Sequence, residues 1–124
     1  MKKITIAFDV DGTLIRNDGP GDMDGGVPIA NERIRSLLIA LSSFKNVRIV
    51  VWSGGGELYA RQVAAAIGIT QYVKEYASKN HIKTTEYPGG KTTHEFNPDL
   101  KPDIAIDDMH SCDLGKFNLI VRQK

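Results

Sequence analysis

The sequence predicts an α/β protein, built as a three-layer α/β/α sandwich around a Rossmann-like parallel sheet of about five strands. Two observations support this prediction. Short runs rich in Ile, Val, Ala and Phe recur along the chain, and they are typical of strands that are buried on both faces. Segments with apolar residues at helical spacing lie between some of these runs. Strands that alternate with helices indicate parallel pairing and right-handed crossovers.

Five segments are expected to form the strands, and two are expected to form helices. The strands are residues 3–10, 47–52, 72–76, 103–107 and 118–121, of which 72–76 is the weakest candidate. Residues 31–44 form the first expected helix, which Asn31 can cap. Residues 57–67 form the second, and Gly68 can end it in the left-handed conformation.

Two connections lack a clear period. Residues 18–27, DGPGDMDGGV, are expected to be a loop or a tight hairpin because they are rich in Gly and Asp. Residues 84–102 carry three prolines and two glycines, and we expect a long irregular connection there.

Length and composition limit the class of protein. The 124 residues fit a single domain over 1–124, which is long enough to bury a core without disulfides or zinc. Hydrophobic content of 41% and charged content of 25% are typical of a globular chain. The net charge of +1, without a basic run, gives no argument for nucleic acid or an anionic membrane as a partner.

The expected compartment is the cytoplasm. The single Cys112 excludes an internal disulfide and fits a reducing compartment. The apolar run near the N-terminus is interrupted by Asp9 and has no small-residue cleavage site, which argues against a signal peptide. No segment approaches the ~20 apolar residues that a membrane helix needs.

The first expected strand ends in two acids. In FDVDGTL, Asp9 and Asp11 are two residues apart at the point where the strand ends. Residues i and i+2 of a strand point to the same side, so both side chains are expected to face one point above the sheet. Open α/β sheets bind their ligands at the carboxyl ends of the strands, which is where these acids lie.

Two further strand ends carry residues capable of chemistry. The strand over 103–107 ends in Asp107 and Asp108, and the strand over 47–52 is followed by Ser53, Gly54 and Gly55. Four carboxylates at one edge repel one another, by about 4 kcal/mol for a pair ~4 Å apart. Oxygen ligands of this kind favour Mg²⁺. The serine hydroxyl and the glycine N–H groups, next to a helix N-terminus, can then bind an anion.

At these residues the sequence resembles the haloacid dehalogenase-like phosphohydrolase superfamily. FDVDGTL is similar to the first motif of that family, hhhDxDGT; VVWSGG is similar to the second motif, and DIAIDD to the fourth. The matches extend from residue 4 to residue 108 and so cover most of the chain. The resemblance implies a Mg²⁺-dependent phosphatase that hydrolyses a phosphomonoester through an aspartyl-phosphate intermediate.

The resemblance also implies a role for each residue. Asp9 would be the nucleophile that attacks phosphorus. Asp11 would be the general acid toward the leaving group and then the base that activates water. Asp9, the backbone carbonyl of Asp11, and Asp107 or Asp108 would hold Mg²⁺, and Ser53 would donate a hydrogen bond to a phosphoryl oxygen.

The third motif of the family is a lysine, for which the chain offers several candidates. We favour Lys79 because it follows the expected strand over 72–76, with Lys83 and then Lys91 behind it. Lys101 precedes its strand, and six residues at ~3.3 Å each place it about 20 Å from Asp107. A solvated surface lysine remains the alternative for each of them.

The chain has no room for a cap domain between the motifs, so it resembles a capless member of the family. An open site implies a bulky phosphorylated substrate, such as a phosphoprotein, a nucleic-acid end or a large glycan, or a second copy of the chain that acts as a lid in a homo-oligomer. Residues 18–26 would then be the segment nearest to the substrate. The identity of the substrate stays open.

Two alternatives belong to other classes of protein. A receiver-type phosphoacceptor module has a similar length and also places acids, a Ser or Thr and a Lys at strand ends. In that class, however, the acid pair lies on the first strand, whereas here the pair comes late. A catalytically silent binding domain on the same scaffold is the second alternative, because the identity of the third-motif lysine is open.

Overall fold

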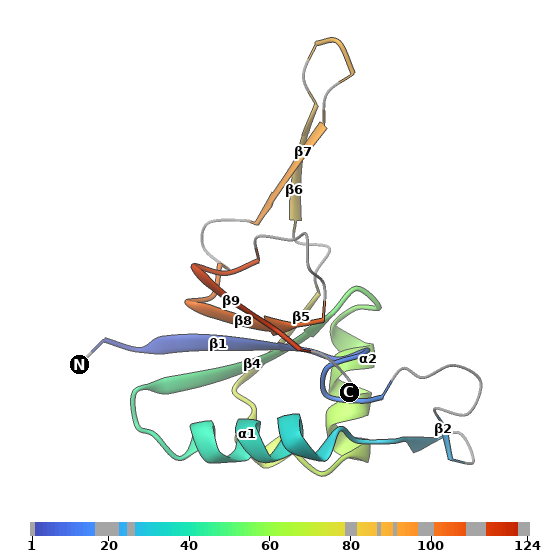
Figure 1. The fold of residues 1–124 in the computed structure, drawn as a ribbon, viewed down its shortest axis with the longest axis vertical. Coiled ribbons are helices and arrows are strands. Elements are labelled where there is room, and N and C mark those ends of the chain that lie inside the picture. Colours follow the sequence, from blue (N-terminus) through green and yellow to red (C-terminus); the bar gives the residue numbers. More distant parts are fainter. Residues whose placement is uncertain are drawn as a thin grey trace.

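The computed structural model places most of the chain in a small α/β fold (Figure 1). The residues that it describes are 2–16, 23–24, 27–78, 82–86, 88–90, 92–96, 101–108 and 114–121. A five-stranded sheet has the order β5-β4-β1-β8-β9, and every neighbouring pair is parallel. Its strands are β1 (Ile4–Asp9), β4 (Val47–Ser53), β5 (Glu75–Ser78), β8 (Ile104–Asp107) and β9 (Phe117–Ile120). The predicted α/β fold around a parallel sheet is confirmed.

The order of the strands reverses once in the sheet. From β1 the chain proceeds to β4 and β5 on one side, and it then returns to form β8 and β9 on the other side. Such a reversal between two neighbouring strands creates a crevice beyond their carboxyl ends, where open α/β sheets bind ligands. In this protein the switch point lies between β1 and β8.

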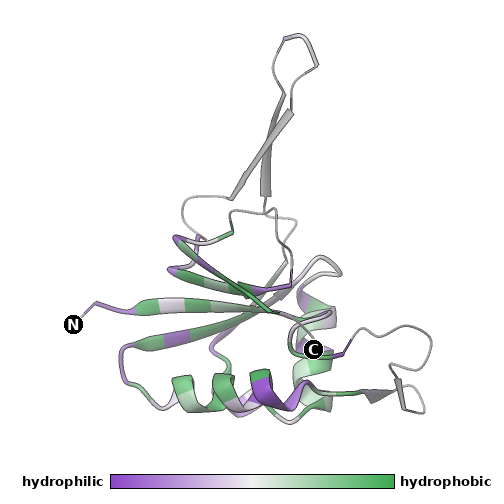
Figure 2. Ribbon diagram, in the orientation of Figure 1, coloured by the Kyte–Doolittle hydropathy of each residue, from purple (hydrophilic) through white to green (hydrophobic). Residues whose placement is uncertain are grey.

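The two helices cover one face of the sheet. α1 (Glu32–Ser42) and α2 (Glu57–Ala66) lie on the same side of it in Figure 1. Leu38 of α1 and Val63 of α2 belong to one buried cluster with Phe8 of β1 and Val51 of β4. Each such side chain contributes about 1.5–3 kcal/mol when it is fully buried. Figure 2 shows the hydrophobic residues along β1 that this packing requires.

The opposite face carries a smaller apolar cluster. It contains Ala7, Val50, Trp52 and Ala105 from three strands, together with Leu114 from the connection between β8 and β9. Right-handed crossovers explain this placement. The connection from β8 to β9 moves across the sheet in the direction opposite to that from β1 to β4, so a right-handed connection must pass over the opposite face. Within the described residues no helix lies on this face, so the second helical layer of the predicted sandwich is not seen there.

Two antiparallel hairpins interrupt the alternation of strands and helices. β2 (Met23–Asp24) pairs with β3 (Val27–Pro28), in agreement with the hairpin alternative for residues 18–27. β6 (Ile82–Glu86) pairs with β7 (Thr92–Phe96), and Figure 1 shows this hairpin standing away from the sheet. The prediction of an irregular connection over 84–102 was therefore wrong for residues 84–86 and 92–96, which form strands.

The local signals at the element ends are mostly as predicted. Gly68 has a φ of 74° and ends α2 in the left-handed region. Asn31 is the N-cap residue of α1, but its side chain makes no capping hydrogen bond within the described residues. A 3₁₀ helix (Thr70–Tyr72) occupies the start of the strand predicted over 72–76, so β5 begins only at Glu75. Across the described ranges, no helix is both long enough and apolar enough to cross a membrane.

Candidate functional site

Three carboxylates meet at the switch point of the sheet. Phe8 of β1 is in register with Ile106 of β8, so the next residues, Asp9 and Asp107, end neighbouring strands side by side. Asp9 is 5% exposed and Asp107 is 4% exposed. The structure brings these two together with Asp108, because one ligand oxygen from each of the three lies within 4.8 Å of the others.

The charge of this cluster has a cost that a cation would offset. Two carboxylates at 4.8 Å repel by about 3.5 kcal/mol at an effective dielectric constant of ~20. Burial raises the pKa of Asp108, and the neighbouring Asp107 carboxylate raises it further. A donor set made only of carboxylate oxygens suits Mg²⁺, which binds through a few acids and keeps several waters. The residues present therefore fit a hard divalent cation.

A tight turn after β1 orients Asp9. The amide of Leu14 donates to the carbonyl of Asp9 at 3.3 Å, and Gly12 adopts a φ of 80°, which favours glycine. This turn places the fully buried Thr13 beside the acid, and Thr13 Oγ1 donates to Asp9 Oδ2 at 3.1 Å. Thr13 had no role in the sequence analysis, although its place in the DGT triplet was the available signal. It restrains the Asp9 carboxylate in one orientation.

Asp11 is exposed, and its carboxylate is not part of the three-acid group. Tyr59 Oη instead donates a hydrogen bond to Asp11 Oδ1 at 2.7 Å. Burial, reinforced by this bond and by the charges of Asp11 and Asp9, raises the pKa of Tyr59 to about 12. The tyrosine hydroxyl therefore stays protonated and remains a donor at neutral pH.

Ser53 lies at the same edge of the sheet, at the end of β4. It follows Trp52, which is in register with Asp9, and it is 1% exposed. The Gly55 amide donates to Ser53 Oγ at 3.0 Å, so this N–H is engaged by the serine and is not directed at an anion. Because Ser53 Oγ accepts this bond, its own proton is available for an external acceptor. Gly54 is exposed, and a Cβ added there would meet no atom within 4 Å.

The structure does not identify which lysine fills the predicted third motif. Lys79 and Lys91 lie outside the described residues. Ser78, the residue before the favoured candidate, ends β5 at the carboxyl edge of the sheet. Lys83 belongs to β6 of the projecting hairpin, and Lys101 is an exposed residue before β8, at the amino edge.

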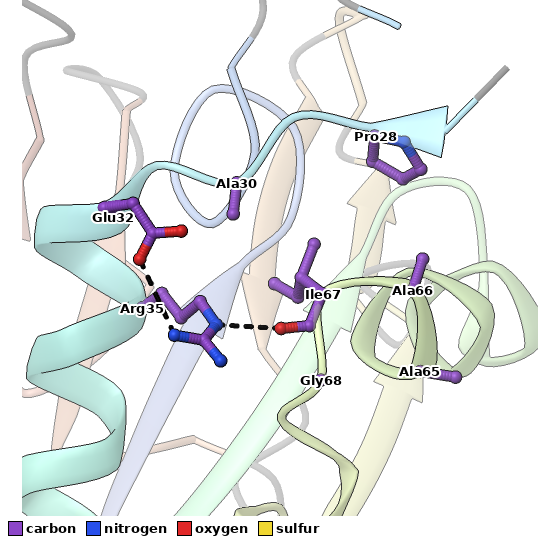
Figure 3. Close-up of a pocket in the computed structure, with 8 residues that line it drawn as sticks. All are labelled: Pro28, Ala30, Glu32, Arg35, Ala65, Ala66, Ile67 and Gly68. Carbon is purple, nitrogen blue, oxygen red and sulfur yellow. Dashed lines mark hydrogen bonds and ion pairs between the residues drawn. The ribbon is translucent and has the colours of Figure 1, made fainter. Parts of the chain in front are cut away.

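A cavity of about 500 Å³ lies elsewhere, between the start of α1 and the end of α2 (Figure 3). Arg35 Nε donates to the Ile67 carbonyl at 2.8 Å, and Arg35 Nη1 lies 3.6 Å from Glu32 Oε2. Arg35 thus links the two helices. The four acids at the strand ends, Asp9, Asp11, Asp107 and Asp108, do not line this cavity, whose walls are Pro28, Ala30, Glu32, Arg35, Ala65, Ala66, Ile67 and Gly68.

Fold and site together define an α/β protein with an acidic cluster at the switch point of a parallel sheet. A buried serine hydroxyl and an exposed acid held by a tyrosine lie at the same edge. Comparison with protein-family models, with curated proteins and with solved structures gives no match to the chain. The functional argument therefore depends on the geometry of the site.

Proposed function

We propose that this protein is a Mg²⁺-dependent phosphohydrolase of the haloacid dehalogenase-like kind, which hydrolyses a phosphomonoester through an aspartyl-phosphate. The observation that supports the proposal most strongly is the meeting of Asp9, Asp107 and Asp108 at the switch point. These acids come from both ends of the chain, and two of them are buried. A bound cation would offset their mutual repulsion.

Under this proposal the three carboxylates would hold Mg²⁺, and the backbone carbonyl of Asp11 would be a further oxygen ligand. The metal would offset the negative charge of the acids and of the phosphoryl group. Within the described residues the donor set contains carboxylate oxygens, which supports a hard cation such as Mg²⁺.

The residues then divide the chemistry between them. An oxygen of Asp9, held in orientation by Thr13, attacks phosphorus, and the bond between phosphorus and the leaving oxygen breaks. Asp11 gives its proton to the leaving oxygen. Asp11 then takes a proton from water, whose oxygen attacks phosphorus and releases Asp9 and inorganic phosphate. Ser53 donates to a phosphoryl oxygen throughout, in the manner of an oxyanion hole.

The exposure of Asp11 supports a substrate with a bulky leaving group. An exposed acid leaves the departing part of the substrate in open space, while the buried acids hold only the phosphoryl group. In the described residues the long connection between β5 and β8 forms a hairpin that stands away from the sheet, in place of a separate folded cap (Figure 1). We therefore propose a large phosphorylated substrate of unidentified class.

Turnover of p-nitrophenyl phosphate, with Mg²⁺ or with EDTA, tests the proposal. We expect hydrolysis by the wild type with Mg²⁺ only, and its loss in Asp9→Asn. Asp103→Asn is the matched control, since Asp103 lies before β8 at the opposite edge of the sheet and accepts a hydrogen bond from the Thr5 amide at 2.8 Å. That variant should keep the activity.

Three results would contradict the proposal. The first is no hydrolysis of p-nitrophenyl phosphate or of a panel of phosphorylated sugars, nucleotides and peptides. The second is hydrolysis that survives Asp9→Asn. The third is uptake of one phosphate per chain from acetyl phosphate with little turnover, which would indicate the receiver-type module instead.

A further inference from the structure

The contact between Tyr59 and Asp11 joins two residues that lie 48 positions apart in the chain. Asp11 is an exposed carboxylate on a turn, and an exposed side chain of this kind samples several rotamers unless it is held. The hydrogen bond from Tyr59 Oη is 2.7 Å long, a distance typical of a hydroxyl that donates to a carboxylate. The hydroxyl therefore restricts Asp11 to one orientation.

The ring of Tyr59 is itself held by the loop that follows β4. A Cβ atom added at Gly55 would lie 3.0 Å from Tyr59 Cδ2 and 3.4 Å from Tyr59 Cγ, so the ring packs directly against this glycine. The neighbouring Gly54 has no atom within 4 Å of the same position. A side chain at position 55 would therefore crowd the tyrosine ring and would also lie 3.4 Å from Ser53 Oγ, whereas the sequence alone suggested that Gly55 binds a ligand.

We propose that Tyr59 is a positioning residue for the acid and base chemistry of Asp11, and that Gly55 is the seat of its ring. This inference rests on the proposed phosphohydrolase function and adds to it. Asp11 Oδ1 accepts the hydrogen bond from Tyr59, so Asp11 Oδ2 is the oxygen that delivers the proton to the leaving group. A misplaced acid loses much of its effect, because proton transfer requires hydrogen-bond distance to the leaving oxygen.

The test compares Tyr59→Phe with the wild type on three aryl phosphates whose leaving groups become more basic. The series is 2,4-dinitrophenyl, p-nitrophenyl and phenyl phosphate. Protonation matters most for a basic leaving group, and kcat/KM reports the steps up to its departure. We expect kcat/KM to fall about 10- to 100-fold on phenyl phosphate, and only slightly on 2,4-dinitrophenyl phosphate.

Two further variants sharpen the result. Gly55→Ala places a methyl group 3.0 Å from Tyr59 Cδ2, so we expect it to shift the ring and to steepen the dependence on the leaving group in the same direction. Tyr76→Phe deletes the same atom from a tyrosine on β5 and should leave the dependence unchanged. Thermal unfolding of every variant confirms that the protein is folded.

The possible failures are distinguishable. An equal loss on all three substrates would indicate a structural role for Tyr59 and would overturn the inference, and so would an unchanged or increased kcat/KM on phenyl phosphate. Absence of hydrolysis by the wild type would refute the proposed function, and this inference with it.

Discussion

Replacing Asp108 by asparagine should stabilise the metal-free protein and weaken its response to Mg²⁺. The substitution keeps the shape of the side chain but removes one charge from the three-acid group, in which Asp9 and Asp107 are buried. Without a bound cation, the repulsion among these carboxylates lowers the stability of the folded protein. The same charge becomes favourable as soon as a divalent cation binds.

The magnitude follows from the geometry. Asp108 interacts with two acids within 4.8 Å, each at about 3.5 kcal/mol for full ionisation and an effective dielectric constant of ~20. Solvent screens the half-buried Asp108, and the protein also relieves the repulsion by protonating it. We therefore expect a gain of about 1–2 kcal/mol in the free energy of unfolding, or about 3–8 °C in Tm.

The pH dependence has a definite sign. The pKa of Asp108 is raised in the folded state by burial and by Asp107, so the folded protein holds this proton longer than the unfolded chain. The stability of the metal-free wild type should therefore fall as the pH rises from about 4 through the raised pKa. In Asp108→Asn this fall should be absent, so the advantage of the variant should grow as the pH rises from about 4 through the raised pKa.

The assay is urea or thermal unfolding in EDTA at several pH values, followed by titration with Mg²⁺. A site-bound cation adds about 2.7 kcal/mol at 100 times its Kd, and this gain should be smaller in the variant. Asp103→Asn is the matched control and should lower stability, since Asp103 accepts from Thr5 and lies 3.4 Å from the Lys116 ammonium. Loss of stability in Asp108→Asn in EDTA, or an undiminished response to Mg²⁺, would refute the reasoning.

Three further predictions concern stability. Tyr76→Phe should raise the free energy of unfolding by about 1 kcal/mol in urea denaturation, because the buried Tyr76 hydroxyl finds no hydrogen-bond partner within the described residues; a loss above this size would show that the hydroxyl is bonded. Arg35→Met should lower it by about 1–3 kcal/mol, because the bond from Arg35 to the Ile67 carbonyl joins α1 to the end of α2; an unchanged midpoint would contradict that role. The hydrogen bond from the Thr5 amide, followed by the Lys116 charge, lowers the pKa of Asp103, so its contribution is full above about pH 4 and is lost as the pH falls through the lowered pKa. Asp103→Asn should flatten this acid limb in thermal unfolding, and an acid limb identical to that of the wild type would count against it.

Much of the fold could be predicted from the chain. The apolar runs over 3–10 and 47–52 gave the central strands β1 and β4, because strands buried on both faces must be continuously hydrophobic. Helical spacing gave α1 and α2, and Gly68 marked the end of the second. These features depend on residues that are close together in sequence.

The hairpin of β6 and β7 was not predicted because its sequence lacks the apolar pattern that identified the other strands. Its threonines are β-branched and favour strands, and Pro88, Gly89 and Gly90 lie in the turn between them, with φ values of 96° and 84° at the two glycines. The segment is polar, so it has no apolar period from which to recognise a strand. A hairpin that stands away from the core does not need one.

The sequence by itself determined which acids and which serine end the strands, because a buried strand and its terminating residues form one local pattern. Only the tertiary structure decided which partner each of these acids contacts. The register between β1 and β8 puts Asp9 beside Asp107, whereas Asp11, two residues further along, accepts a hydrogen bond from Tyr59. The physical reason is that the spacing of residues along the chain determines at which edge of the sheet a side chain lies. The partner of that side chain depends on the order of the strands and on how α2 packs against the sheet.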